Sequence, residues 1–176
     1  MKKTLPKYPR ILAIAPSSRG FGFALVEGLD MLADWGVKSI KGDKNAGCVS
    51  KVAEMGAHYQ PDVIVLEDAA IKPSRHSPRI QALGKRIAAL AKRSGTVVMM
   101  FSRKQVRQAF FAEGQGTKHA IAEFLANKYP EELGARLPPK RRPWMSEDYR
   151  MDIFDALALA LALRRRSARH RMSAER

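Results

Sequence analysis

Hydrophobic residues occur along the chain in short runs, separated by turns rich in Gly, Pro and Ser. Two such runs, 11–15 and 21–26, are joined by the polar segment 16–20. This spacing predicts a β-hairpin. A third strand is expected over 34–41, so the chain opens with three consecutive strands.

Apolar residues three or four positions apart predict helices further along the chain. The predicted helices span 47–59, 79–93, 104–111 and 118–127 (with Thr117 as its N-cap), and a last one runs from residue 146 or 147 to about 166. A continuously apolar run at 63–66 follows the first helix and indicates a buried parallel strand, and 96–101, after the second helix, is expected to be another apolar strand. This order predicts the α/β fold class, with one mixed sheet and helices packed on its faces.

Two segments fall outside this regular pattern. Residues 130–143 hold four prolines and several basic residues, which predicts a mobile basic loop. The last residues, 167–176, are polar and basic, and we expect them to form a flexible tail. The sequence therefore predicts one domain over 8–166, with a basic loop inserted at about 131–147.

The charge of the chain indicates its class of partner. Its 176 residues include 32 Lys and Arg against 17 Asp and Glu, a formal net charge of +15, so nucleic acid is the expected partner. No apolar run reaches the roughly 18 residues that span a bilayer, and no membrane partner is expected. The single cysteine, Cys48, excludes an intrachain disulfide framework and a Cys-rich zinc site. A cytoplasmic, nucleoid-associated protein is the resulting expectation.

Three carboxylates are the candidate chemical groups. Glu67 follows the predicted parallel strand 63–66, and the carboxyl ends of such strands are where open α/β sheets place their sites. Asp152 and Asp155 are three positions apart, so they share one face of a helix. A strand ending at the surface and acids that favour the helix dipole are the alternative explanations. Together the three acids are a ligand set for Mg²⁺, which can promote phosphodiester hydrolysis.

Four blocks of the sequence, in order, resemble one known family. They are ILAIAPSSR at 11–19, QPDVIVLE at 60–67, QVRQ at 105–108 followed by GTK at 116–118, and DIFDALALA at 152–160. Together they are similar to the RuvC-type Holliday junction resolvases, a branch of the RNase H-like nucleases. The resemblance implies an RNase H-like fold with a five-stranded mixed sheet. It also implies a homodimer that cuts four-way DNA junctions with Mg²⁺ or Mn²⁺.

The resemblance also implies roles for individual residues. Glu67, Asp152 and Asp155 match the family's metal ligands. Lys118 matches a basic residue that contacts the scissile phosphate in the family. These four residues are therefore the expected catalytic set.

Ala15 departs from the family pattern. The first strand of the family normally carries an aspartate at this position, and an alanine side chain cannot bind a cation. A relocated ligand is one explanation, and the candidates are Ser17, Ser18, Asp43 and Asp68. The others are a natural protein that binds nucleic acid without cutting it and an engineered inactivating change. Without compensation, the metal would be bound weakly or not at all.

A set of basic residues and one aromatic residue is expected to bind nucleic acid. Trp144 lies in the proline-rich loop, where it can stack on a base or pin the loop to the domain. The expected phosphate-binding residues are Lys72, Arg75, Arg79, Arg107, Lys118, Lys140, Arg141 and Arg142.

The leading hypothesis is a Mg²⁺-dependent endonuclease that acts on branched DNA. The alternative is a catalytically inactive DNA- or RNA-binding or scaffold module on the same fold. Cleavage assays would separate these two, and competition between DNA and RNA would identify the nucleic acid.

Overall fold

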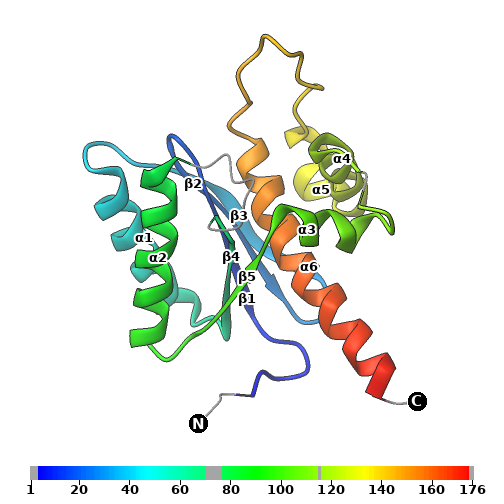
Figure 1. Ribbon diagram of the computed structural model, residues 1–176, viewed down its shortest axis with the longest axis horizontal. Coiled ribbons are helices and arrows are strands. Elements are labelled where there is room, and N and C mark those ends of the chain that lie inside the picture. Colours follow the sequence, from blue (N-terminus) through cyan, green and yellow to red (C-terminus); the bar gives the residue numbers. More distant parts are fainter. Residues whose placement is uncertain (1–3, 70–76, 115, 175–176) are drawn as a thin grey trace.

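A single five-stranded sheet forms the centre of the computed structural model, which describes residues 4–69, 77–114 and 116–174 (Figure 1). Its strand order is β3-β2-β1-β4-β5. The strands are β1 (Ile11–Pro16), β2 (Gly20–Glu27), β3 (Met31–Ser39), β4 (Val63–Glu67) and β5 (Val97–Phe101). The strand β1 pairs antiparallel with β2 and parallel with β4, and β4 pairs parallel with β5. The predicted hairpin and the predicted parallel strand at 63–66 are confirmed, and the strand expected at 96–101 is present and pairs parallel with β4. The third strand lies slightly earlier than expected.

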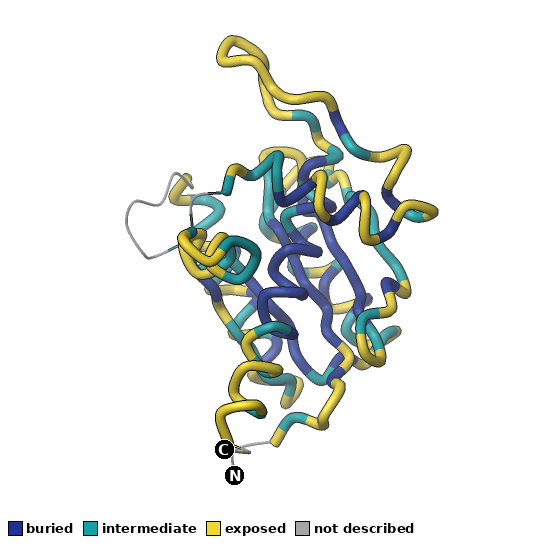
Figure 2. Tube along the Cα trace, turned by 90° about the vertical axis from the view of Figure 1, so that its right-hand side faces the viewer, coloured by how far each residue is buried: buried dark blue, intermediate teal, exposed yellow. Residues whose placement is uncertain are grey.

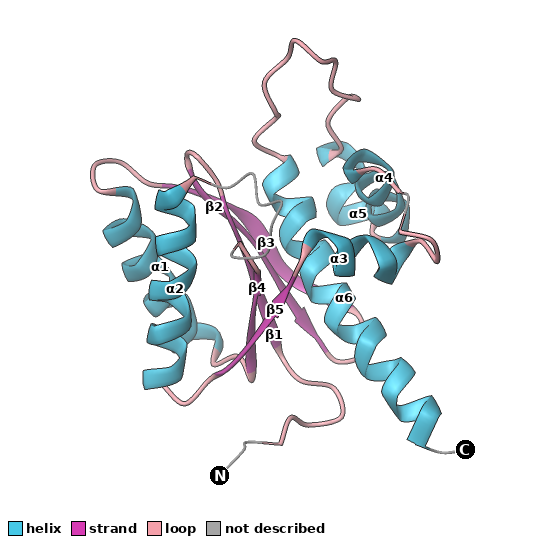
Figure 3. Cartoon of the chain, in the orientation of Figure 1, coloured by secondary structure: helices cyan, strands magenta, loops and turns pink. Residues whose placement is uncertain are grey.

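Helices cover both faces of this sheet (Figure 3). They are α1 (Lys44–Tyr59), α2 (Pro78–Arg93), α3 (Arg103–Phe110), α4 (Lys118–Lys128), α5 (Pro130–Leu133), the short 3₁₀ helix η1 (Gly134–Arg136) and α6 (Met151–Ala174). One face is covered by α1 and α2, and the other by α6 together with the shorter helices. The predicted α/β class with a five-stranded mixed sheet is confirmed.

Alternate residues of β1 belong to two separate hydrophobic cores. Leu12 and Ile14 pack with the residues of α1 and α2. Ala13 and Ala15 belong to the core that contains the buried part of α6. Because successive side chains of a strand point to opposite faces, this alternation fixes which strand residues can reach α6. Figure 2 shows that buried residues are concentrated in the sheet and along the first part of α6.

The last helix, α6, differs from the prediction at both ends. It begins at Met151 rather than at residue 146 or 147, because Asp148 accepts from the backbone N–H of Arg150 and pairs with its guanidinium group. It continues to Ala174, so 167–174, which we expected to be a flexible tail, are the last turns of the helix. Every residue from 156 to 163 is buried. Among the described residues, no helix is both long and apolar enough to cross a membrane.

The segment predicted as a mobile basic loop, 130–143, is partly helical. Pro130 is the first residue of α5, a position where its missing N–H group costs nothing. Leu133 is fully buried and anchors this turn in the core. Only the remainder, 137–150, forms a loop, and it projects away from the sheet and helices (Figure 1). The basic loop therefore lies later in the chain than expected, and the α5 turn that precedes it is packed in the core.

Candidate active site

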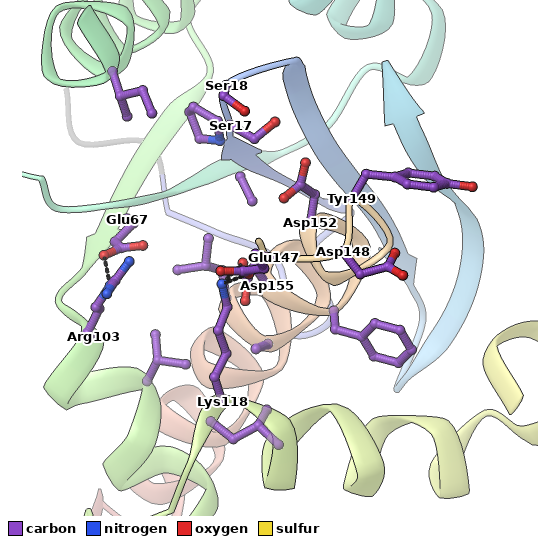
Figure 4. A pocket seen from close by; sticks show the side chains of 18 of the residues that line it. Ser17, Ser18, Glu67, Arg103, Lys118, Glu147, Asp148, Tyr149, Asp152 and Asp155 are labelled. Carbon is purple, nitrogen blue, oxygen red and sulfur yellow. Dashed lines mark hydrogen bonds and ion pairs between the residues drawn. The ribbon is translucent and has the colours of Figure 1, made fainter. Parts of the chain in front are cut away.

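A cavity of about 300 Å³ lies where the ends of β1 and β4 meet the first turns of α6 and α4. All four residues predicted as catalytic line it, although they come from distant parts of the chain (Figure 4). These are Glu67, Lys118, Asp152 and Asp155.

Glu67 enters the cavity because of the register of β4. Leu66 packs in the core beneath α1 and α2, so the next side chain points to the α6 side. There the Glu67 Oε1 atom accepts a hydrogen bond from Arg103 Nε at 2.9 Å. Arg103 is the first residue of α3, whose start is fixed by a capping box between Ser102 and Gln105. The carboxylate of Glu67 is therefore already paired with a cation from a well-defined helix end.

The two aspartates of α6 lie deep in the same cavity. Burial raises the pKa of Asp152 above its ordinary value. Burial also raises the pKa of Asp155 to about 6, against the opposing effect of the Lys118 ammonium group. Burial, which removes hydration from the carboxylates, is the largest cause of both shifts, and the negative charge of Glu147 also raises both pKa values.

Lys118 connects two carboxylates in the cavity. Thr117 caps α4 by accepting a hydrogen bond from the backbone N–H of Ala120, and this places Lys118 on the first turn. Its Nζ atom lies 2.7 Å from Asp155 Oδ2 and also donates to Glu147 Oε1. Burial lowers the pKa of Lys118, but these two carboxylates outweigh it and raise the pKa overall.

Glu147 and Arg103 are site residues that the sequence analysis missed. Both line the cavity and both form an ion pair with a predicted site residue. The sequence analysis places Glu147 only at the end of the basic loop or at the start of the last helix, and assigns it no role in the site. It could have been found as an acidic residue five positions before Asp152, on the segment that leads into the same helix. Arg103 could have been found as the first cation after strand β5, which pairs with β4 at Glu67.

Ala15 lines the cavity as expected for the first-strand position, and only 8% of it is exposed. Among the candidate replacement ligands, Ser17 and Ser18 also line the cavity. Asp43 instead caps α1, where its side chain accepts from a backbone N–H, and it does not line the cavity. Asp68 does not line it either, so it is an unsuitable replacement as the chain is arranged here.

The predicted nucleic-acid-binding residues fall into three groups. Arg107 is exposed and lines the cavity. Arg79 is partly buried and donates to Ser17 O at 2.8 Å and Asn45 Oδ1 at 3.1 Å, so its side chain holds the turn between β1 and β2. Lys72 and Arg75 lie outside the described residues.

The remaining predicted contacts lie on the projecting loop. Lys140, Arg141 and Arg142 are all exposed there. Trp144 is 76% exposed, and its ring lies 5.6 Å from the Arg142 guanidinium carbon. The alternative that Trp144 pins the loop to the domain is therefore wrong, because a pinning tryptophan would be buried.

The donor set of the cavity fits a hard divalent cation. The Lys118 ammonium group already bridges two carboxylates, Glu147 and Asp155, which shows that their oxygens converge on one cationic position. Among the described residues, no three Asp, Glu, His or Cys side chains are gathered closely enough to hold a metal as they stand. Mg²⁺ does not require such a cage, since one or two carboxylates with water and substrate phosphate are its usual ligands. Asp155 and Asp152, which share one face of α6, would be the protein ligands, while Glu67, the third predicted ligand, is paired with Arg103.

Comparison with known proteins places this fold in a class. No protein-family model matches the sequence, and no match was found among curated proteins. The fold, however, is similar to that of solved structures of RuvC and of a mitochondrial Holliday junction resolvase.

Three solved structures illustrate the likeness. RuvC of Thermus thermophilus has a TM-score of 0.63 at 20% identity, over 86% of this chain and 91% of its own. The same protein in complex with a Holliday junction substrate has a TM-score of 0.61 at 20% identity, over 86% and 90%. The yeast mitochondrial Holliday junction resolvase Ydc2 has a TM-score of 0.65 at 15% identity, over 93% and 83%. At these identities the likeness shows the fold, so what this chain binds and does rests on its own residues.

Proposed function

We propose that this protein binds branched DNA and that the cavity is a site for Mg²⁺-dependent phosphodiester hydrolysis. The observation that carries the proposal is that Glu67, Asp152, Asp155 and Lys118 all line one cavity of a chain with net charge +15. An acidic pocket within a basic chain suits an enzyme that must hold both a cation and a polyanion. The RuvC structure with a bound Holliday junction supports branched DNA as the substrate class.

The residues around the cavity have distinct roles in this proposal. Arg107 and Arg103 supply the planar guanidinium groups that recognise phosphate. Lys118 donates to a non-bridging oxygen of the scissile phosphate once the phosphate has replaced Glu147 as its partner. The carboxylates of Asp152 and Asp155 hold the divalent cation. That cation, when bound, supplies an activated water and stabilises the negative charge that develops on the phosphate.

Binding without cleavage is the second candidate, and Ala15 favours it. The methyl group at this position adds no oxygen ligand to the cavity, and the neighbouring carboxylates are already neutralised by Lys118 and Arg103. A protein with this site would recognise branched DNA but would hold a metal too weakly to cut it.

Cleavage of a labelled four-way junction in Mg²⁺ or Mn²⁺ decides between the two candidates. The unmodified chain is compared with Glu67→Gln and with Ala15→Asp. Cleavage by the unmodified chain that Glu67→Gln abolishes supports the nuclease. Cleavage by Ala15→Asp alone supports the binding protein, and it shows that one missing carboxylate is the cause. If the unmodified chain and Ala15→Asp both bind the junction but neither cuts it, the nuclease proposal is wrong.

We also propose that the chain acts as a homodimer in the nucleoid. A four-way junction is nearly two-fold symmetric, and a two-fold dimer would present one cavity to each of two opposed strands. Light scattering after size-exclusion chromatography, with and without junction DNA, tests this stoichiometry. A single chain per junction would contradict it.

A further inference from the structure

A second cavity, of about 270 Å³, lies between α3 and the C-terminal half of α6. Its polar lining is cationic or neutral, and no Asp or Glu of the described part of the chain belongs to it. The polar residues are Gln105, Gln108, Arg165, Arg166, Arg169 and His170. A concave surface with this composition suits an anion.

This second cavity lies on the same stripe of α6 as the first. Asp155 and Ala158 line the first cavity, and Ala162, Arg166 and Arg169 line the second. Residues at these spacings of three and four share one helix face. At 1.5 Å per residue, Arg166 and Arg169 lie roughly 16 to 21 Å along the axis from Asp155.

Helix α3 separates the two cavities. Arg103, Val106 and Arg107 line the first cavity, whereas Gln105 and Gln108 line the second, and these two sets lie on opposite sides of a helix. The exposed cations Arg103 and Arg107 therefore lie on the side of α3 that faces the first cavity. A polyanion that crosses α3 from the first cavity would meet no carboxylate in the lining of the second cavity.

The structure divides the C-terminal arginine run into anchors and exposed residues. Arg164 is buried and donates to Pro9 O at 2.7 Å, and Arg171 donates to Lys7 O at 3.3 Å. Arg165 donates to Ala109 O at 2.8 Å. Arg166 and Arg169 are exposed and form no ion pair within the described residues. These two are the cations of the run that remain available to a ligand.

Aromatic rings hold the guanidinium groups of this cavity in place. The guanidinium carbon of Arg165 lies 4.7 Å from the centroid of Phe110 and 5.1 Å from that of Phe124. The guanidinium carbon of Arg166 lies 5.1 Å from the centroid of Phe101. Stacking of this kind orients the planar group before the ligand arrives, so less side-chain freedom is lost on binding.

We infer that this second cavity binds a backbone phosphate of a DNA arm that extends from the first cavity. The inference rests on the proposed binding of branched DNA and adds a second contact to it. For an arm that runs parallel to α6, the separation of roughly 16 to 21 Å corresponds to about five or six base pairs at 3.4 Å each along the duplex axis. The cavity therefore recognises the length and direction of an arm rather than the branch point itself.

The test replaces both exposed arginines, as Arg166→Gln with Arg169→Gln. Its matched control is Arg86→Gln with Arg93→Gln, which removes two exposed arginines from α2 on the other face of the sheet. Junction affinity is measured over a range of salt concentrations. The slope of log K against log salt falls by about 0.9 for each phosphate that the protein no longer neutralises. We expect the affinity of the test variant to fall about tenfold and its slope to fall by about 0.9, the value for one phosphate, and we expect the control to change little. Circular dichroism checks that both variants are folded.

A scan of neutral methylphosphonates along one arm locates the bound phosphate. In the wild-type chain, we expect affinity to fall when the neutral group lies about five or six base pairs from the branch. The test variant should be insensitive at that position. If the test variant and the wild type have the same junction affinity, the same salt slope and the same sensitivity to the methylphosphonate, this inference is overturned. The proposed binding of branched DNA is not affected by that result. Failure of the wild-type chain to bind any junction overturns the proposed function, and the inference with it.

Discussion

A Cβ atom on Gly22 would lie 2.2 Å from the backbone carbonyl oxygen of Asp152. Gly22 pairs with Ala15 across the β1–β2 ladder, so two very small residues face the start of α6. The close approach of this helix to the sheet brings the Asp152 carboxylate into the cavity. The backbone of α6 can occupy this place only because Gly22 has no side chain.

Gly22→Ala should therefore disturb the site and destabilise the fold. The new methyl group must push the first turn of α6 outward, which costs on the order of 1–3 kcal/mol. We expect a lower melting temperature and weaker Mg²⁺ binding by calorimetry. Gly84→Ala is the control, because a Cβ at this α2 position meets nothing within 4 Å. That change should stabilise the protein by roughly 0.5–1 kcal/mol. Equal melting temperatures for the two variants would contradict the argument.

The raised pKa of Asp155 makes a prediction about pH and stability. Its pKa is about 6 in the folded protein, against an ordinary value of 3.8. Between these values the folded state binds more protons, so the contribution of Asp155 to the free energy of unfolding falls as pH rises and levels off above 6. Asp155→Asn should stabilise the metal-free protein at pH 7 by about 1 kcal/mol, after discounting for solvent screening of a partly exposed group. Thermal melts in a chelator at pH 4 to 8 measure this.

Asp148→Asn is the control with the opposite sign. The hydrogen bond from Arg150 lowers the pKa of Asp148 below 3.8, so this carboxylate stabilises the folded state above that pH. Its removal should lower the melting temperature at pH 7.

Adding Mg²⁺ should raise the melting temperature of the wild type but not of Asp155→Asn. A destabilised Asp155→Asn in chelator would show that Asp155 contributes more through Lys118 than it loses by burial.

Much of the fold could be predicted because local pattern and tertiary structure agree. The apolar run that became β4 has no competing interpretation, and α2 begins within one residue of its predicted start. The ends of α6 could not be predicted in this way. Its start is delayed by the local pairing of Asp148 with Arg150, and its last turns contact the N-terminal segment through Arg171 and Lys7. Contacts between residues so far apart leave no periodic signal in the sequence.

Site residues with a regular position in a helix or strand could be predicted from the sequence. Those brought to the site only by tertiary contacts could not. Asp152 and Asp155 share a helix face, and Glu67 ends a buried strand, so their types and spacing pointed to a common place. Glu147 lies on an irregular, exposed loop. Its ion pair with Lys118 depends on the path of that loop, and no spacing rule indicates it.

Glu147→Gln should strengthen DNA binding. Glu147 holds the Lys118 ammonium group, so it competes with phosphate for the same donor. Its neutral replacement removes a charge-assisted partner and one negative charge beside the DNA. We expect Kd for a four-way junction to fall by roughly two- to fivefold, or about 0.5–1 kcal/mol. Fluorescence anisotropy at fixed salt measures the change.

Glu131→Gln supplies the matched control for charge. Glu131 is exposed on α5, so its loss gives the same change in net charge without releasing Lys118. The control should leave Kd within error of the wild type. A similar gain in both variants would mean that net charge alone is responsible, and the competition between Glu147 and phosphate would be refuted.

Trp144→Ala should weaken binding to branched DNA without affecting the fold. The indole ring is exposed at a turn of the projecting loop, where Met145 N–H donates to Arg142 O at 3.0 Å. Stacking of one base on such a ring contributes about 1–3 kcal/mol, so we expect junction Kd to rise at least fivefold. Trp144→Phe keeps an aromatic face and should recover most of the affinity. Because the ring is not part of the core, the melting temperatures of both variants should match the wild type. Equal loss in the Phe and Ala variants would rule out stacking as the role of this residue.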